Sequence, residues 1–170
     1  MITEFKTKFV RHSDLKSDEI QKIIYIKQQY WDYSFESQMK WINDNLFDDD
    51  YHLWFELNTG EIIAYLNIVN LDVRVDESNK RLLGIGNVCV DKNVLGNGLG
   101  KLLMQTANYY IKNTNEVAIL LCKKHLLGFY QKAGWHVFNG DMMLQKVIFK
   151  DIVMFSKVFH CSSIFINRNF

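Results

Sequence analysis

The residues with the clearest chemical potential form a glycine cluster, Gly96-Asn97-Gly98-Leu99-Gly100, between an apolar strand pattern and a helix pattern. The first N–H groups of a helix have no partner inside the helix, and the helix dipole makes that end positive. Glycine allows the backbone to approach an anion closely and to adopt positive φ. A strand, a glycine loop and a helix in this order therefore predict a phosphate-binding site at the start of the helix.

Two common phosphate loops are excluded by individual residues. The P-loop pattern G-x-x-x-x-G-K-S/T fails because Leu95 stands at its first glycine and Leu102 at its hydroxyl position. The dinucleotide fingerprint G-x-G-x-x-G fails because Lys101 stands at its last glycine. A tight strand-to-helix turn without a ligand remains the alternative interpretation of these glycines.

Length and composition are those of an ordinary globular protein, with 170 residues, 48% hydrophobic and 23% charged. The net charge of +1 gives no electrostatic argument for a nucleic acid or a membrane surface, so we expect neither as a partner. Three cysteines do not make a disulfide framework, and the N-terminal residues lack the apolar run of a secretory signal. We therefore expect a cytoplasmic protein without a metal site.

Hydrophobic periodicity predicts the elements that position the glycine loop. Strands are expected over residues 4–12, 50–57, 61–69, 81–90, 116–122, 135–138 and 145–155, and helices from Ser17, from Ser34, from Leu99 and over residues 125–133. The polar segment 72–80 is expected to be a loop. This order predicts an α+β fold around a largely antiparallel sheet, with one strand–helix–strand crossover.

The chain shows no internal linker, so residues 1–155 are expected to form a single domain. The tail, residues 156–170, is apolar enough to need a partner surface. We expect the tail to pack on the sheet edge or on a partner chain, the second case giving a homodimer.

Two motifs resemble those of the GCN5-related N-acetyltransferases (GNAT family). The first runs from Val88 to Leu103, where Gly98 and Gly100 match the glycines of the family's acetyl-CoA loop and Leu95 replaces its Gln or Arg. The second, Gly128 to Trp135, is similar to the family signature FYxKxGF. The resemblance implies the GNAT fold: a mixed, mostly antiparallel sheet of six to seven strands, about four flanking helices, and a cofactor cleft where the fourth and fifth strands splay apart.

The resemblance also implies an activity, the transfer of an acetyl group from acetyl-CoA to a primary amine by direct attack in a ternary complex. Tyr130 would protonate the departing CoA thiolate as a general acid. Cys89 is a poor rival nucleophile, because its apolar neighbours do not lower a thiol pKa. The implied cofactor-binding residues are Val88, Cys89, Val90, Leu95, Gly96, Asn97, Gly98, Leu99, Gly100 and Lys101.

The general base and the acceptor are less determined by the sequence. The family often places a Glu on the fourth strand, and residues 81–90 offer no carboxylate. Asp91, Glu56, His52 and His125 are candidates elsewhere, and a chain of water molecules is another.

Acidic and aromatic residues between the first two helices suit a cationic amine, either a small molecule or a peptide. The predicted substrate-binding residues are Trp31, Asp32, Tyr33 and Glu36, with a buried helix junction as the alternative. Because Leu95 and Lys123 depart from the family pattern, an acetyl-CoA-binding sensor or partner module with little turnover is the alternative function.

Overall fold

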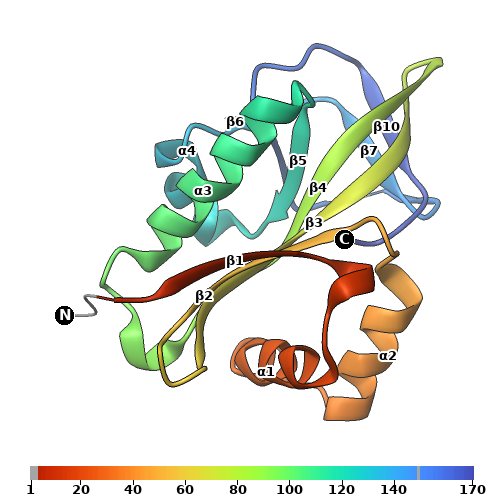
Figure 1. The fold of residues 1–170 in the computed structure, drawn as a ribbon. Coiled ribbons are helices and arrows are strands. Elements are labelled where there is room, and N and C mark those ends of the chain that lie inside the picture. The colour runs from red at the N-terminus through yellow and green to blue at the C-terminus, as the bar shows by residue number, and fades with distance from the viewer. Residues whose placement is uncertain (1–3, 149) are drawn as a thin grey trace.

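The structure, a computed structural model, describes residues 4–148 and 150–170, and within them it contains ten strands and four α-helices (Figure 1). The helices are α1 (Ser17–Gln28), α2 (Phe35–Asn45), α3 (Leu99–Thr114) and α4 (Leu127–Lys132). The strands are β1 (Lys6–Arg11), β2 (Tyr51–Glu56), β3 (Ile62–Val75), β4 (Ser78–Val90), β5 (Ala118–Cys122), β6 (His136–Val137), β7 (Asp141–Leu144), β8 (Val147–Ile148), β9 (Ile152–Phe155) and β10 (Ser163–Ile166).

All ten strands belong to one mixed sheet, ordered β6-β9-β5-β4-β3-β10-β7-β8, with β2 and then β1 added beside the first half of β3. The pairs β4–β5 and β7–β10 are parallel, and the other pairs are antiparallel. The mostly antiparallel sheet and the four helices agree with the sequence prediction. The strand count exceeds the expected six to seven, because several strands near the C-terminus are only two to four residues long.

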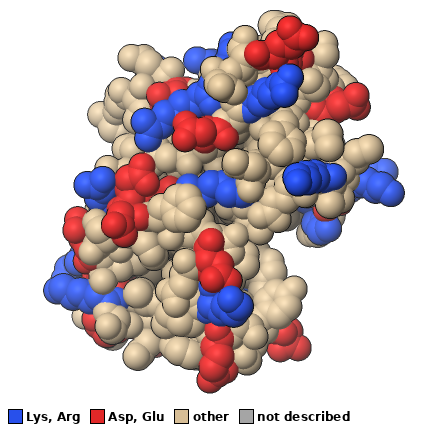
Figure 2. Space-filling view, turned by 90° about the vertical axis from the view of Figure 1, so that its right-hand side faces the viewer, with Lys and Arg blue, Asp and Glu red and all other residues tan. Residues whose placement is uncertain are grey.

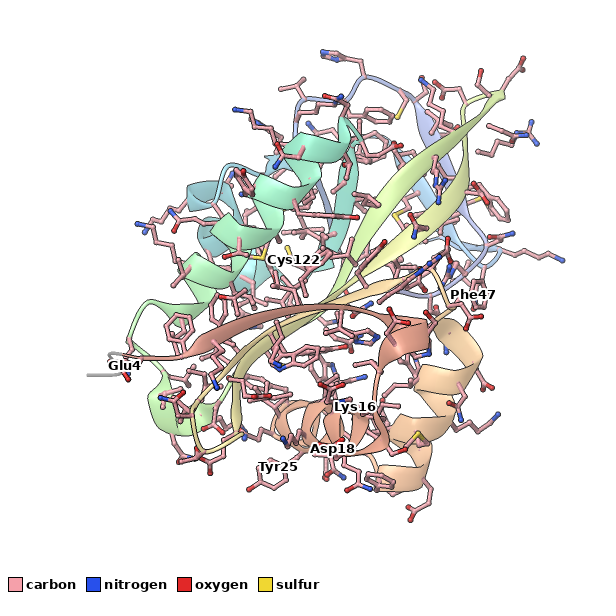
Figure 3. All side chains as sticks on the ribbon, viewed as in Figure 1. Glu4, Lys16, Asp18, Tyr25, Phe47 and Cys122 are labelled. Atoms are coloured by element: carbon pink, nitrogen blue, oxygen red, sulfur yellow. The ribbon has the colours of Figure 1, made fainter. Side chains whose placement is uncertain are left out.

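The helices cover both faces of the sheet, with α3 on one face and α1 and α2 on the other (Figure 1). On the first face, Leu103 and Ala107 of α3 join the core that contains Leu66 of β3. On the second face, Ile23 of α1 packs in a cluster with Trp54 of β2. The outer side of α1 is polar or exposed, and Tyr25 points away from the sheet (Figure 3).

Residues 72–80 do not form the expected loop. They are the end of β3 and the start of β4, joined at Asp76, which has a positive φ of 49°. Val73 and Val75 are buried, whereas Asp72 and Arg74 are exposed, so the segment alternates as a half-buried strand. The charged residues hid that alternation, and β10, the strand that pairs with this end of β3, comes from the far end of the sequence.

The expected strand over residues 145–155 is also divided. Gln145 and Lys146 have φ of 48° and 68° and make the turn between β7 and β8, and β9 begins only at Ile152. Neither side chain favours the left-handed region, so composition gave no turn signal here.

The C-terminal residues are anchored by one buried ion pair. The guanidinium of Arg168 donates to Oδ2 of Asp50 and to the carbonyl oxygen of Asn45, both at 2.6 Å. It also stacks 3.8 Å from the centre of the Phe47 ring, which lies beyond the end of α2 (Figure 3). The anchor places Phe170 against Gly84 of β4, where a Cβ atom would lie 2.6 Å from the phenyl ring. The end of the chain is therefore part of the central sheet's packing.

Lys and Arg are interspersed with Asp and Glu on the face shown in Figure 2. That face presents no continuous charge of one sign. Among the described residues, no helix has both the length and the apolar character needed to cross a membrane.

Arg168→Met is expected to lower the free energy of unfolding by about 3 kcal/mol, because it leaves the buried Asp50 carboxylate without its countercharge. The matched control is Arg81→Met, which removes an exposed partner of the neighbouring Asp49 at 3.7 Å and should cost less than about 1 kcal/mol. Urea unfolding of both variants checks the difference. Equal losses would contradict the anchoring role of Arg168.

Candidate active site

The site is built where β4 and β5 separate. The two parallel strands pair only from Leu83 with Ala118 to Ile85 with Leu120. Beyond Ile85, the described part of β4 continues to Val90 paired with β3 alone. The edge of β4 that faces β5 is therefore open to a ligand along residues 86–90, as expected for a cleft between splayed strands.

A β-bulge lies at the point of separation. Gly86 pairs with Asn67 and Cys89 pairs with Tyr65, so two residues of β4, 87 and 88, oppose a single residue of β3. Asn87 has a positive φ of 52°, and its Nδ2 donates to Oδ1 of Asn67 at 2.7 Å. A bulge of this kind bends the strand and increases its local twist.

The start of α3 offers unpartnered backbone N–H groups. Gly98 precedes the helix in a left-handed conformation, with φ of 77°, and no side chain caps the helix. The first helical hydrogen bond runs from the Leu102 N–H to the Gly98 carbonyl, at 3.1 Å. The N–H groups of the three residues between them thus have no helical partner, and the first turn carries no acid that would compete with an anion.

Gly96 and Gly98 serve the loop through their backbone conformation. Both have positive φ, and a Cβ atom at either position would meet open space. The turn therefore needs glycine for its positive φ and not because a larger side chain would clash. The space beside both residues is free for a ligand. Asn97 closes the turn by donating its Nδ2 to the Val94 carbonyl at 3.0 Å.

A groove of about 430 Å³ runs from this loop to α4. It brings together all of the expected cofactor-binding residues except Asn97, whose side chain is used in the turn. Tyr30, which was not among the expected cofactor-binding residues, also lines the groove, and its hydroxyl donates to the Val90 carbonyl at 2.6 Å. The groove is lined by Tyr30, Val88, Cys89, Val90, Val94, Leu95, Gly96, Gly98, Leu99, Gly100, Lys101, Phe129 and Tyr130.

A second cavity, of about 670 Å³, lies between the α1–α2 junction and the separating strands. Trp31 and Tyr33, two of the predicted substrate-binding residues, line it. Asp32 and Glu36 are exposed and do not line it. The remaining lining residues are Lys27, Ser37, Gln38, Trp41, Ile85, Gly86, Asn87, Val88, Leu121, Cys122, Lys123, Leu126, Tyr130, Asp151 and Phe170.

The groove and the pocket share Val88 and Tyr130. Tyr130 lies on α4, is only 6% exposed, and its hydroxyl has no hydrogen-bond partner within the described chain. Burial raises the pKa of Tyr130 well above its ordinary value, and the nearby Cys122 adds to the shift. The hydroxyl is therefore protonated at neutral pH and available as a donor where the two cavities meet.

Lys27 is a pocket residue that the sequence prediction missed. It is 2% exposed, and its Nζ lies 4.5 Å from the centre of the Trp41 ring. No hydrogen bond or ion pair holds this ammonium in residues 4–148 and 150–170. Burial lowers the pKa of Lys27 to about 8, against a smaller opposite effect of Cys89. The sequence did contain a signal that Lys27 is buried, because residue 27 follows Ile20, Ile23 and Ile24 at helical spacing and so belongs to the buried face of α1.

The other two charged side chains of the pocket are paired with each other. Nζ of Lys123 lies 2.6 Å from Oδ2 of Asp151. Lys27 is thus the one charged side chain without an ion-pair partner among the described residues that line the pocket.

None of the four candidate bases lines the pocket. His52 is fully buried, and its ring forms hydrogen bonds with the ring of His12 at 3.0 Å and with the Tyr65 hydroxyl at 2.8 Å. Burial lowers the pKa of His52 to about 3. The Asp91 carboxylate accepts from the side chain of Gln29. Glu56 accepts from the indole of Trp54, and His125 is exposed.

Two cysteines lie near the meeting point, and neither is an activated thiol. Cys89 is 3% exposed, and burial raises the pKa of its thiol well above the ordinary range. Cys122 (Figure 3) lines the pocket, and burial followed by the charge of Asp151 also raises the pKa of its thiol. Both therefore remain thiols at neutral pH.

A larger, more open hollow of about 1140 Å³ lies between α4, β6 and residues 158–162. None of the predicted cofactor-binding residues lines it, nor does Trp31, Asp32, Tyr33 or Glu36. The described residues hold no cluster of metal-ligating side chains there or elsewhere. The paired groove and pocket are therefore the candidate active site.

Comparison with known families gives one clear match. The model of the acetyltransferase (GNAT) family matches residues 19–135, which is more than half of the chain. In a comparison with curated protein sequences, the chain finds no match.

Several solved structures have the same architecture. An acyl-CoA N-acyltransferase from Pseudomonas aeruginosa is 18% identical, with a TM-score of 0.68 over 91% of this chain and 100% of that one. ElaA from Escherichia coli is 20% identical, with a TM-score of 0.64 over 91% of this chain and 100% of that one. YhbS from Escherichia coli, a GNAT family N-acetyltransferase in complex with CoA, is 15% identical, with a TM-score of 0.65 over 98% of this chain and 92% of that one. At these identities the similarity shows the fold, and the predicted fold class is confirmed.

Lys27→Met is expected to stabilise the protein at pH 7. The folded state holds the pKa of Lys27 near 8 instead of 10.5, and at about 1.4 kcal/mol for each pKa unit the buried charge costs about 3 kcal/mol. The unfolded chain keeps its proton between pH 8 and 10.5 while the folded wild type releases it. The advantage of the variant should therefore be full below pH 8 and shrink as the pH rises toward 10.5.

Urea unfolding at pH 7, 8.5 and 10 measures this trend. Lys22→Met, on the same helix but outside the pocket, is the control, and its effect should stay within about 0.5 kcal/mol at each pH. A destabilised Lys27→Met protein at pH 7 would mean that the ammonium supports the fold.

Proposed function

The chain belongs to the acetyltransferase (GNAT) family, and from this premise we propose that it transfers an acetyl group from acetyl-CoA to a primary amine by direct attack in a ternary complex. Family membership implies the coarser activity, an acyl-CoA-dependent N-acyltransferase. The observation that carries the proposal is that the glycine-loop groove and the second pocket meet at Val88 and Tyr130. Donor and acceptor can then approach one point from two sides.

The start of α3 is the proposed pyrophosphate site. Free N–H groups at residues 99–101, the positive end of a 16-residue helix and the side chain of Lys101 all favour an anion. Leu95 is 56% exposed and supplies no polar group in the place of the family's Gln or Arg. The backbone therefore provides most of the binding at this end.

The open edge of β4 is the proposed site of the pantetheine arm. On the side where β5 has separated, residues 86–90 form no strand pair, and the Val90 carbonyl accepts from the Tyr30 hydroxyl. An extended amide chain can pair with the remaining backbone groups there as an added strand. The bulge at residues 87 and 88 then lies beside the thioester, where a backbone N–H would stabilise the charge that develops on its oxygen.

Acetyl-CoA supplies the acyl group as a thioester, and the residues of the chain order the transfer. The pocket presents the neutral amine, whose nitrogen forms a bond to the thioester carbon while the carbon–sulfur bond breaks. Tyr130 holds the proton that the departing sulfur takes up, and the nitrogen loses its extra proton to water. The high pKa values of Cys89 and Cys122 argue against an acyl-cysteine step.

Release of free CoA thiol from acetyl-CoA, measured with a panel of primary amines, tests the proposal. Tyr130→Phe should lower kcat by about 10² to 10³, because the general acid is lost, and should leave the dissociation constant of acetyl-CoA within about twofold. The matched control is Tyr109→Phe, an exposed tyrosine on α3, which should behave as wild type.

Two results would contradict the enzyme proposal. One is binding of acetyl-CoA without stimulation of thiol release by any amine, which the sensor or partner-module alternative predicts. The other is an unchanged kcat in Tyr130→Phe, which would remove the general acid from the mechanism.

A further inference from the structure

We infer that the acceptor is a primary amine that also bears a carboxylate, and that Lys27 binds this carboxylate. The class that fits is a free α-amino acid with an apolar side chain. The inference rests on the proposed function and specifies its substrate.

The first support is the unpaired ammonium itself. Lys27 is almost fully buried, and among the described residues it contacts an aromatic face and no anion. Burying a charge without a partner is costly, and the Trp41 ring offsets only part of that cost. A carboxylate in the pocket would provide the missing partner.

The anion at Lys27 belongs to the acceptor rather than to the CoA phosphates. Lys27 lines the pocket and not the groove, whereas Lys101 lines the groove and not the pocket. Tyr130 and Val88 border both cavities, so the reacting end of the acceptor lies beside them. Lys27 then contacts a different part of the same acceptor molecule.

The remaining surface of the pocket suits an apolar body. Trp31, Tyr33, Trp41 and Leu126 contribute flat or aliphatic surface. A polycation would find no free acidic side chain in this lining, because Asp151 is already paired with Lys123. The acids that first suggested a cationic acceptor, Asp32 and Glu36, are exposed outside this lining. These features favour a zwitterionic acceptor over the cationic amine that was expected from the sequence.

Four amines that differ in charge test the inference in the thiol-release assay at pH 7. They are phenylalanine, phenylalaninamide, phenethylamine and spermidine. The wild type should favour phenylalanine over phenylalaninamide by at least about tenfold in kcat/KM, mainly through KM, as expected for one charge-assisted hydrogen bond. Lys27→Met and Lys27→Gln should reduce this ratio to within about twofold, and Lys22→Met should keep the wild-type ratio.

A second readout does not depend on turnover. Calorimetry should show that the wild type binds N-acetylphenylalanine at least about tenfold more tightly than N-acetylphenylalaninamide, and that both Lys27 variants lose the difference. Thermal unfolding of each variant confirms that the proteins compared are folded.

The outcomes separate this inference from the proposed function. Thiol release that favours phenethylamine or spermidine would overturn the carboxylate inference and leave the acetyltransferase proposal standing. Lys27-dependent binding of N-acetylphenylalanine without thiol release from any amine would overturn the acetyltransferase proposal and leave the carboxylate inference standing. A carboxylate preference that survives in both Lys27 variants would overturn the role of Lys27.

Discussion

The constraint on which the site depends is the short parallel pairing of β4 with β5. Three paired positions hold the two strands together, and beyond Ile85 the described residues of β4 do not pair with β5. The same geometry leaves a free strand edge, creates the pocket on one side and leads to the start of α3 on the other. If the strands stayed paired for two or three residues more, the open edge and the contact between the two cavities would both be lost.

Local features of the site could be predicted from the sequence. The glycines at 96 and 98 specify a left-handed turn, and the helix that follows has a free N-terminus, so the place of the proposed anion site can be derived from residue types alone. The candidate role of Tyr130 was inferred from the second motif, Gly128 to Trp135. Features that join distant segments could not be predicted in this way: the contact of Phe170 with Gly84, the pairing of β10 with the end of β3, and the charge neutralisation of Asp50 by Arg168.

Lys27 illustrates a third case, in which the sequence signal existed but has two meanings. Helical periodicity places this residue on the buried face of α1. A lysine on a buried face either covers apolar surface with its aliphatic carbons or presents its ammonium to a ligand. The structure favours the second interpretation, because Nζ lies beside Trp41 at the wall of a cavity without an anionic side-chain partner in the described chain. In the proposed function, the same lysine would link a cost in stability to the choice of substrate.

The claim that donor and acceptor meet at Tyr130 is tested most directly by a crystal structure with a bisubstrate analogue, in which the CoA sulfur is joined through an acetyl spacer to the nitrogen of phenylalanine. We expect its pyrophosphate at the N–H groups of residues 99–101, its sulfur within hydrogen-bond distance of the Tyr130 hydroxyl, and its amino-acid part in the pocket beside Lys27. An analogue whose amino-acid part lies outside that pocket, or whose sulfur lies away from Tyr130, would contradict the account.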